Sequence, residues 1–310
     1  MIVTTTLANL PAPGPGGSVV SIGVFDGVHL GHRAILSGNV SRARSSGARP
    51  TVVTFRDHPK QLLLGRAPRT LTSLEHRLEL FRRAGIEHTL VLAFDERLRA
   101  MSAAQFAAEV LVRGLSARTF VLGFDSKFGN SRSGTPEELR RLGYTVEVVE
   151  QVLVRGRAVS STAIREAVEL GDLEAAREML GRPFSVFGEV VHGDGLGRRL
   201  GFPTANVDPH HELLPPRGVY ACWARRPLRE SLAPQPAVVN IGVRPTLDRG
   251  GDAELRIEAH LLEFEGDLYG ETLELEFVRG LRAEQRFGGL DELCAQIARD
   301  ISAARAILLR

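Results

Sequence analysis

Residues Gly23–His32 read Gly-Val-Phe-Asp-Gly-Val-His-Leu-Gly-His, which places two histidines three residues apart where an apolar run gives way to a helix. The apolar run Val19–Val24 predicts a buried strand, Asp26 and Gly27 predict a turn, and a helical pattern begins near Leu30. The free N–H groups and the positive dipole end at a helix N-terminus favour an anion. The segment therefore predicts a strand, turn and helix arranged to bind phosphate.

Strand-like and helix-like runs alternate between Val19 and Glu150, which is typical of parallel strands joined by crossover helices. The expected strands are Val19–Phe25, Thr51–Phe55, Thr89–Phe94, Thr119–Phe124 and Thr145–Val149. A helix marked by Leu74, Leu78 and Phe81 should start after Ser73 and stop at Gly85. This half predicts a Rossmann-like α/β domain.

After Gly171 the pattern changes to strands without long helices between them, which favours an antiparallel β-barrel. The expected strands are Val186–Val191, Val219–Ala224, Ala237–Ile241, Ile257–Leu262 and Leu273–Val278. Leu273–Phe277 alternates apolar residues with glutamates, so one face should be buried and the other wet. An apolar stripe formed by Leu293, Ile297, Ile301, Ala304 and Leu308 predicts a C-terminal helix.

Length and composition agree with two globular domains. The 310 residues are 43% hydrophobic and 25% charged, with a net charge of +2, which gives no basic field for nucleic acid or an anionic membrane. We find neither a secretory leader nor a membrane-length apolar run, so we expect a cytoplasmic protein. Cys222 and Cys294 are too few and too distant in sequence for a disulfide framework or zinc site, and we expect both to be small core residues.

Two motifs carry a resemblance to known enzymes. The His29-Leu-Gly-His32 motif resembles the His-x-Gly-His signature of the nucleotidyltransferase superfamily, and Gly197–Asn206, which ends in Pro-Thr-Ala-Asn, resembles the signature of riboflavin kinases. In this order and at this length, the chain resembles bacterial bifunctional riboflavin kinase/FAD synthetases over nearly its whole extent. The resemblance implies an FMN adenylyltransferase domain over residues 1–181 and a riboflavin kinase domain over residues 182–310.

The resemblance also implies the substrates and cofactor. These are riboflavin, FMN and ATP, with Mg²⁺ as the metal and FMN and FAD as products. We expect no nucleic-acid or membrane partner, and a homo-oligomer stays open.

Adenylyl transfer needs reactants held in line and the added charge spread, which His29 and His32 suit. Ser160–Arg165 reads Ser-Ser-Thr-Ala-Ile-Arg and matches a family motif, which implies hydroxyls at a helix N-cap and Arg165 toward the outer phosphates. Further nucleotide-binding residues expected in this half are Gly23, Phe25, Asp26, Gly27, Gly31, Gly123, Asp125, Ser160, Ser161 and Thr162.

Two segments of this half depart from the family pattern. Thr54–Pro59 carries Asp57 where a proline is usual, and Gly123–Gly129 carries Ser126 for an aromatic residue and Lys127 for an arginine. An acidic group would repel anions, a lost ring would weaken stacking, and lysine lacks the bidentate fork of arginine. The flavin contacts that the resemblance implies here are Phe55, His58 and Phe128.

The second half contains no lysine, because Lys60 and Lys127 are the only two in the chain, so a Walker-type site is excluded. The resemblance implies a flexible loop, Gly193–Gly197, that closes over ATP. It assigns nucleotide contacts to Gly195, Gly197, Arg198 and Gly201. Thr204 and Asn206 offer the oxygen ligands that suit Mg²⁺, and the resemblance makes them the metal residues.

On the expected strand Ile257–Leu262, Glu258 and His260 share the polar face, and the resemblance makes Glu258 the base for the ribityl hydroxyl. The segment Leu281–Phe287 resembles the one that covers the flavin, with Arg282 facing phosphate and Phe287 packing on the ring. Asn240–Thr246 also matches the family and is expected to be scaffold near the site.

Three hypotheses follow. The first is a bifunctional enzyme that makes FMN and then FAD. The second is a riboflavin kinase fused to a non-catalytic flavin- or nucleotide-binding module, motivated by Asp57 and Ser126. The third keeps both halves active on an altered flavin or another nucleotide.

Overall fold

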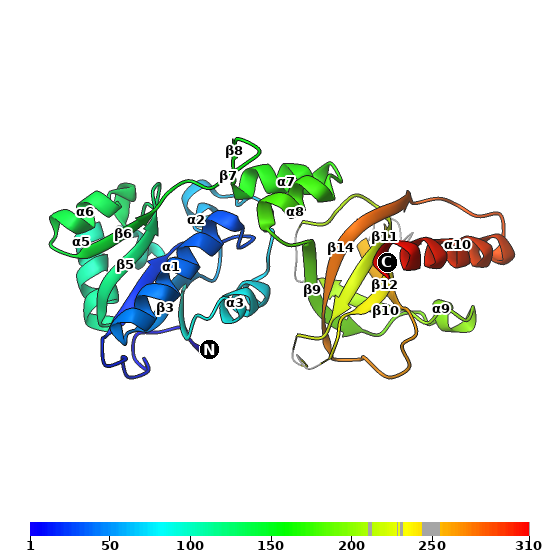
Figure 1. Cartoon of the computed structure of the whole chain (residues 1–310), viewed down its shortest axis with the longest axis horizontal. Helices are drawn as coiled ribbons and strands as arrows, with labels where there is room; N and C mark the ends of the chain where they lie inside the picture. The colour runs from blue at the N-terminus through cyan, green and yellow to red at the C-terminus, as the bar shows by residue number, and fades with distance from the viewer. Residues whose placement is uncertain (210–212, 228, 230–231, 244–254, 310) are drawn as a thin grey trace. The chain divides into compact units, whose positions relative to one another are not determined.

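A computed structural model of the chain describes residues 1–209, 213–227, 229, 232–243 and 255–309. The chain forms two compact units, residues 1–69 with 74–161 and residues 70–73 with 162–310 (Figure 1). By compactness, residues 162–181 group with the second unit, while the functional boundary between residues 181 and 182 stays a prediction.

The first unit contains a six-stranded sheet in the order β1-β4-β3-β2-β5-β6, with every neighbouring pair parallel. The strands are β1 (Ile2–Thr4), β2 (Ser18–Ile22), β3 (Arg49–Phe55), β4 (His88–Leu92), β5 (Ala117–Gly123) and β6 (Thr145–Val149). The expected α/β fold is confirmed. β1 was missed because it is three residues long and largely exposed at the sheet edge.

The helices of this unit are α1 (Leu30–Ser46), α2 (Lys60–Leu64), α3 (Leu74–Arg83), α4 (Glu96–Ala100), α5 (Ala103–Gln105) and α6 (Pro136–Arg141). A π-helical segment (Phe106–Gly114), a 3₁₀ turn (Asn130–Arg132) and a small hairpin of β7 (Leu153–Val154) and β8 (Arg157–Ala158) complete it. Figure 1 shows α1 along the sheet. Asn39 Nδ2 on this helix donates to Val19 O and Thr51 O, and Leu36 is buried in one cluster with Val52 of β3. The helix predicted after Ser73 is α3.

Between the sheet and the barrel, the chain forms α7 (Ser161–Glu169) and α8 (Leu173–Leu180). The second unit is a closed antiparallel barrel in the order β10-β13-β12-β11-β14-β9. Its strands are β9 (Phe184–Val191), β10 (Ala205–Pro209), β11 (Gly218–Arg225), β12 (Gln235–Val243), β13 (Leu255–Leu261) and β14 (Thr272–Ala283). The barrel is confirmed, but β10 was missed because Asn206, Asp208 and Pro209 give it the composition of a loop.

Two helices accompany the barrel, α9 (Leu196–Arg199) and α10 (Leu290–Leu308). α10 packs on the barrel through Ala304 and Leu308, which are buried against Val219 and Val238. This confirms the predicted C-terminal helix and its apolar stripe. Among the described residues, no helix combines the length and the apolar character needed to cross a bilayer.

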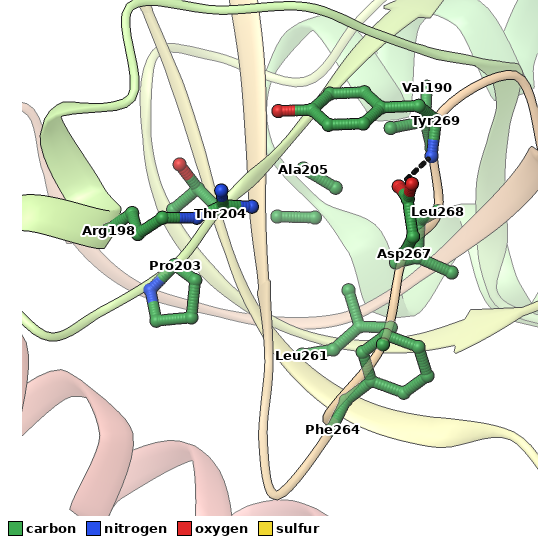
Figure 2. Close-up of a pocket in the computed structure, with 12 residues that line it drawn as sticks. Val190, Arg198, Pro203, Thr204, Ala205, Leu261, Phe264, Asp267, Leu268 and Tyr269 are labelled. Carbon is green, nitrogen blue, oxygen red and sulfur yellow. Dashed lines mark hydrogen bonds between the residues drawn. The ribbon is translucent and has the colours of Figure 1, made fainter.

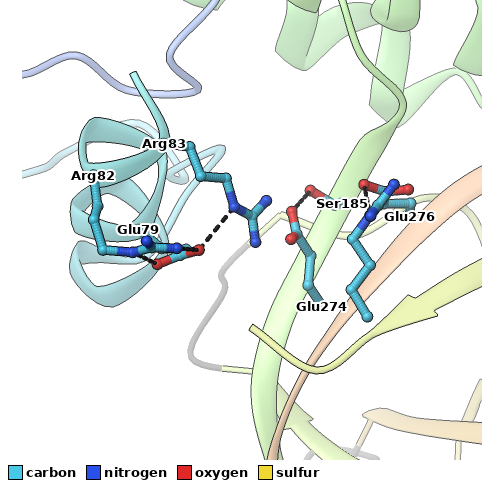
Figure 3. Close-up of polar contacts among 7 residues, drawn as sticks. Glu79, Arg82, Arg83, Ser185, Glu274 and Glu276 are labelled. Atoms are coloured by element: carbon cyan, nitrogen blue, oxygen red, sulfur yellow. Dashed lines mark hydrogen bonds and ion pairs between the residues drawn. The ribbon is translucent and has the colours of Figure 1, made fainter. Parts of the chain in front are cut away.

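The predicted wet face of Leu273–Phe277 is wrong at Glu274. This side chain is 1% exposed, and its Oε1 accepts a hydrogen bond of 2.9 Å from Ser185 Oγ on β9 (Figure 3). Glu276 is paired with Arg225 at 2.7 Å. Alternation shows which residues share a face, but the burial of the Glu274 carboxylate depends on a hydrogen-bond partner from the neighbouring strand β9.

The cysteine prediction is confirmed for Cys222, whose burial raises the pKa of its thiol well above the usual value. Cys294 on α10 is only partly buried, so it is not the core residue that was predicted. Cys294 comes directly after Leu293, which lines a cavity, and lies beside the apolar stripe of α10.

Candidate active sites

The histidine loop (Gly23–His32) follows β2, next to the point where the strand order of the sheet reverses. Strands β3 and β4 lie on one side of β2 and β5 lies on the other, so the loops after β2 and β5 leave the sheet in different directions. Ligands of open α/β sheets bind outside the carboxyl ends of the strands at such a point. The topology therefore places Gly23–His32 and Gly123–Gly129 where a ligand site is expected.

Several hydrogen bonds fix the turn that leads to the histidines. Gly23 N donates to Val53 O at 3.1 Å, and Ser161 Oγ, at the start of α7, donates to Asp26 O at 2.9 Å. Within the turn, Phe25 and Val28 have φ of 54° and 40°, in the left-handed region that such side chains rarely adopt. The contacts around the turn must hold this conformation.

His29 and His32 lie at the N-terminus of α1 with their rings stacked, 3.6 Å apart and at an interplanar angle of 16°. His29 is the N-cap, and its Nδ1 accepts from the backbone N–H of His32 at 3.3 Å. In the neutral ring the proton then lies on Nε2, which becomes the donor. Gly31 gives the His29 ring room, because a Cβ there would lie 3.3 Å from it.

The environment of His32 disfavours its charged form. Burial, then the neighbouring His29 and then Arg77 lower the pKa of His32 well below its ordinary value. The buried Nδ1 of His32 has no hydrogen-bond partner. A neutral imidazole has one N–H that can donate to an anionic oxygen and one nitrogen that can accept a hydrogen bond.

A cavity of about 280 Å³ opens at the carboxyl ends of β2, β3, β4 and β5. It brings together Phe55, His58 and Phe128, the three residues of this half that were predicted to contact the flavin. Phe94 packs edge-on against Phe55 with ring centroids 5.8 Å apart. The wall is thus aromatic and suits a flat heterocycle.

The same cavity is lined by four cations, Lys60, Arg99, Lys127 and Arg132. Sequence reasoning noted Lys127 only as a departure from the family pattern and missed the other three. Their common signal is that each lies on a segment that follows a parallel strand. Together they make the cavity suited to an aromatic ligand that carries an anion.

The remaining predicted residues of the first half lie on these loops or on α7. Gly123 ends β5, and Asp125 is exposed on the turn that follows it. Ser160 precedes α7, Ser161 and Thr162 begin it, and Arg165 lies one turn further along. The predicted helix start at the Ser-Ser-Thr motif is confirmed.

In the second unit, a cavity of about 230 Å³ brings together four of the predicted site residues, Thr204, Glu258, Arg282 and Phe287. Gly197 of the glycine loop (Gly193–Gly197) lines the same cavity. Leu293 and Ile297 of α10 line it as well. Glu258 and His260 share the outer face of β13, whereas Ile257, Ala259 and Leu261 are buried, as the alternation predicted.

A smaller pocket of about 80 Å³ adjoins Thr204 on another side (Figure 2). Arg198, Asp267 and Tyr269 line it, and Asp267 Oδ1 accepts from the backbone N–H of Tyr269 at 2.9 Å. Leu261 and Phe264 form an apolar part of the pocket's lining. Thr204 lines both cavities, so a group bound in one meets a group bound in the other at this threonine.

The glycine loop lies directly against the two residues predicted to bind metal. A Cβ on Gly193 would collide with the Asn206 amide, and a Cβ on Gly197 would lie 3.0 Å from Thr204 Oγ1. Gly195 and Gly201 have φ of 68° and 84°. The loop thus forms a close cradle around two neutral oxygen donors.

These donors match a metal that keeps water and phosphate ligands. Within the described parts of the chain, no group of three His, Cys, Asp or Glu residues could hold an ion by itself. Hard oxygen donors in small number are what Mg²⁺ uses when it binds together with a nucleotide. Thr204 and Asn206 therefore fit Mg²⁺.

Arg282 is held by a carboxylate on α10. Its Nε and Nη2 donate to Asp300 Oδ2 at 3.0 and 2.9 Å, and its guanidinium lies 5.6 Å from the centre of the Phe287 ring. Sequence reasoning missed Asp300, because its role depends on the contact between β14 and α10. Asn240 lines the same cavity as Arg282, while residues 244–246 of the predicted scaffold segment lie outside the described residues.

Comparison with known families matches both halves of the chain. The FAD synthetase family matches residues 13–163, and the riboflavin kinase family matches residues 180–308. Proteins called bifunctional riboflavin kinase/FMN adenylyltransferase are similar over most of their length. The one from Escherichia coli K12 is 38% identical over 96% of this chain and 95% of its own, and the one from Pseudomonas fluorescens is 41% identical over 94% and 93%.

A solved structure extends the likeness to the fold of both units. The crystal structure described as a macrolide-efflux protein from Streptococcus pneumoniae aligns with a TM-score of 0.81 and 28% identity, covering 98% of each chain. The matched families and the relatives agree. The chain belongs to the family of bifunctional riboflavin kinase/FMN adenylyltransferases.

Proposed function

We propose that the second unit phosphorylates riboflavin with ATP to give FMN, and that the first unit adenylylates FMN with ATP to give FAD and pyrophosphate. The observation that carries the kinase assignment is the position of Thr204 between the two cavities. The larger cavity suits the flavin, and the smaller one, with Arg198 at its edge, suits the nucleotide. Phosphoryl transfer would then occur beside Thr204.

Glu258 is the base in this proposal. It lines the larger cavity with Thr204, and its carboxylate can accept the proton of the ribityl hydroxyl as the phosphoryl group moves. Arg282, held by Asp300, orients Phe287 beside the flavin. Thr204 and Asn206 would hold Mg²⁺, which when bound would neutralise charge on the phosphates.

For adenylyl transfer, the stacked His29 and His32 would donate to the α-phosphate of ATP, where negative charge accumulates. The N-terminus of α1 adds free N–H groups at the same place. The aromatic and cationic cavity beside them would hold the isoalloxazine ring and the phosphate of FMN. Ser161, whose Oγ donates to Asp26 O, would bind the outer phosphates, and the same role for Thr162 and Arg165 stays a prediction from the Ser-Ser-Thr-x-x-Arg motif.

The test is chromatographic product analysis of the purified chain with riboflavin, ATP and Mg²⁺, repeated with FMN supplied directly. FMN followed by FAD supports both activities. FMN alone, with supplied FMN left unconverted, would exclude adenylylation and favour the alternative of a kinase fused to a non-catalytic module or one that uses a different flavin or nucleotide. Loss of FMN formation would exclude the kinase.

Asp57 and Ser126 motivate the alternative of a kinase whose first unit is non-catalytic or uses another flavin or nucleotide. The negative charge of Asp57, however, lies near the positive charge of Arg77. Burial lowers the pKa of Arg77, and Asp57, after Asp26 and Glu75, opposes this lowering, so Asp57 interacts favourably with a cation beside the site. A cytoplasmic location, small molecules as the only partners and an open oligomeric state stay predictions from the sequence.

A further inference from the structure

One buried arginine joins the ends of two strands beneath the histidine loop. Arg77 on α3 is 4% exposed; its Nη1 donates to Val24 O at 2.6 Å and its Nη2 to Phe55 O at 3.2 Å. Val24 follows β2, and Phe55 ends β3. The planar guanidinium can reach both carbonyls at once, which the single ammonium of a lysine cannot reproduce.

The same helix supports the next residue of the loop. Phe81, one turn beyond Arg77, packs edge-on against Phe25 at 5.5 Å, and Phe25 packs edge-on against His32 at 5.2 Å. Phe25 has the left-handed φ of 54°, which the surrounding structure must impose. Arg77 binds the carbonyl before Phe25 and Phe81 contacts its ring, so α3 holds this conformation from two sides.

We propose that Arg77 is a positioning residue for adenylyl transfer, which fixes the loop that carries His29 and His32 by joining the ends of β2 and β3. This inference rests on the adenylyl transfer proposed above. Arg77 does not need to touch a substrate for this role. A small displacement of the histidines would be enough to slow the reaction, because the chemistry depends on their placement.

The positive charge of Arg77 also affects the pKa of His32. The groups that act on His32 are His29 and Arg77, and both add to burial in lowering the pKa of His32. Asp26, Glu75 and Asp57 act on Arg77 and favour its charged form against burial. Removal of the Arg77 charge should therefore raise the pKa of His32, so that His32 protonates at a higher pH.

The experiment compares FMN adenylylation by the wild type, R77K, R77M and R82M across pH, with riboflavin phosphorylation measured on the same samples as a check of folding. Arg82 is the control, because it lies on the same helix and pairs with Glu79 at 2.8 Å (Figure 3). R77M should lose about 100-fold in kcat for adenylylation. Its acid-side loss of activity should move to higher pH, because protonation of the buried His32 against the stacked His29 disturbs the placement of the two rings.

R77K keeps the charge but cannot hydrogen-bond both Val24 O and Phe55 O, so its adenylylation should be slower than that of the wild type. Its activity should fall at the same acidic pH as that of the wild type. R82M should match the wild type. Adenylylation by R77M within about twofold of R82M, with an unchanged acid limb, would overturn the proposal.

An NMR titration of the His32 imidazole, assigned with H32Q, separates this inference from the proposed function. If the wild type does not adenylylate FMN, the proposed function fails, whatever the variants do. The positioning role is then judged by the titration alone. Ring chemical shifts of His32 that change in R77K, which keeps the charge but cannot hydrogen-bond both carbonyls, support the role, and shifts identical to those of the wild type overturn it.

Discussion

Asn206 on β10 and Glu258 on β13 lie directly opposite each other in the antiparallel ladder, and Glu258 is likewise opposite Asn240 on β12. Directly opposed residues of a ladder project on the same face and contact each other. Three adjacent strands thus place the proposed metal ligand, the proposed base and a neutral amide in one row. The barrel register thus places the proposed metal ligand and the proposed base side by side.

The first prediction concerns Glu258. The E258Q variant keeps the shape of the side chain and removes its ability to accept a proton, so riboflavin phosphorylation should fall about 100-fold or more. Adenylylation of supplied FMN should be unchanged. E189Q is the matched control, because Glu189 is exposed on β9 of the same barrel. Equal kinase rates for E258Q and E189Q would remove Glu258 from the mechanism.

The second prediction concerns the glycine loop. G193A introduces a Cβ that collides with the Asn206 amide, so the loop must move away from the proposed metal site. The KM for ATP in the kinase reaction should rise about tenfold. G289A is the control, because a Cβ at Gly289 meets nothing within 4 Å. If steady-state kinetics give the same KM for both variants, the loop does not form the nucleotide cradle.

Much of this arrangement was predictable from local sequence. The strand and turn before His29, the helix start at Ser161 and the alternation around Glu258 each depend on a few neighbouring residues, and all are confirmed. Patterns of period two and the turn chemistry of glycine act over that range.

What sequence could not supply depends on contacts between distant segments. Strand β10 is polar and is a strand only because β9 and β13 pair with it. Glu274 is buried because Ser185 on a neighbouring strand hydrogen-bonds it. Arg77 and Asp300 gain their positions from contacts made across 53 and 18 residues of chain.

The third prediction concerns pH and stability. Burial, with a smaller contribution from Arg49, lowers the pKa of His88 to about 4, and its Nε2 contacts Thr4 Oγ1 at 2.9 Å. Between pH 6.5 and about 4, His88 is protonated in the unfolded chain but neutral in the folded protein. The free energy of unfolding therefore falls as the pH decreases through this window. Calorimetric melting temperatures should decline less over this window in H88Q than in the wild type. Parallel declines would contradict the shift.

The most direct test of the central claim, that two separate sites act in sequence, mixes two single variants. With riboflavin, ATP and Mg²⁺, E258Q alone should form little FMN or FAD, and H32Q alone should stop at FMN. The mixture should form FAD, because FMN released by H32Q can be adenylylated by E258Q. A mixture that accumulates FMN without FAD, or H32Q that forms FAD alone at the wild-type rate, would contradict the account.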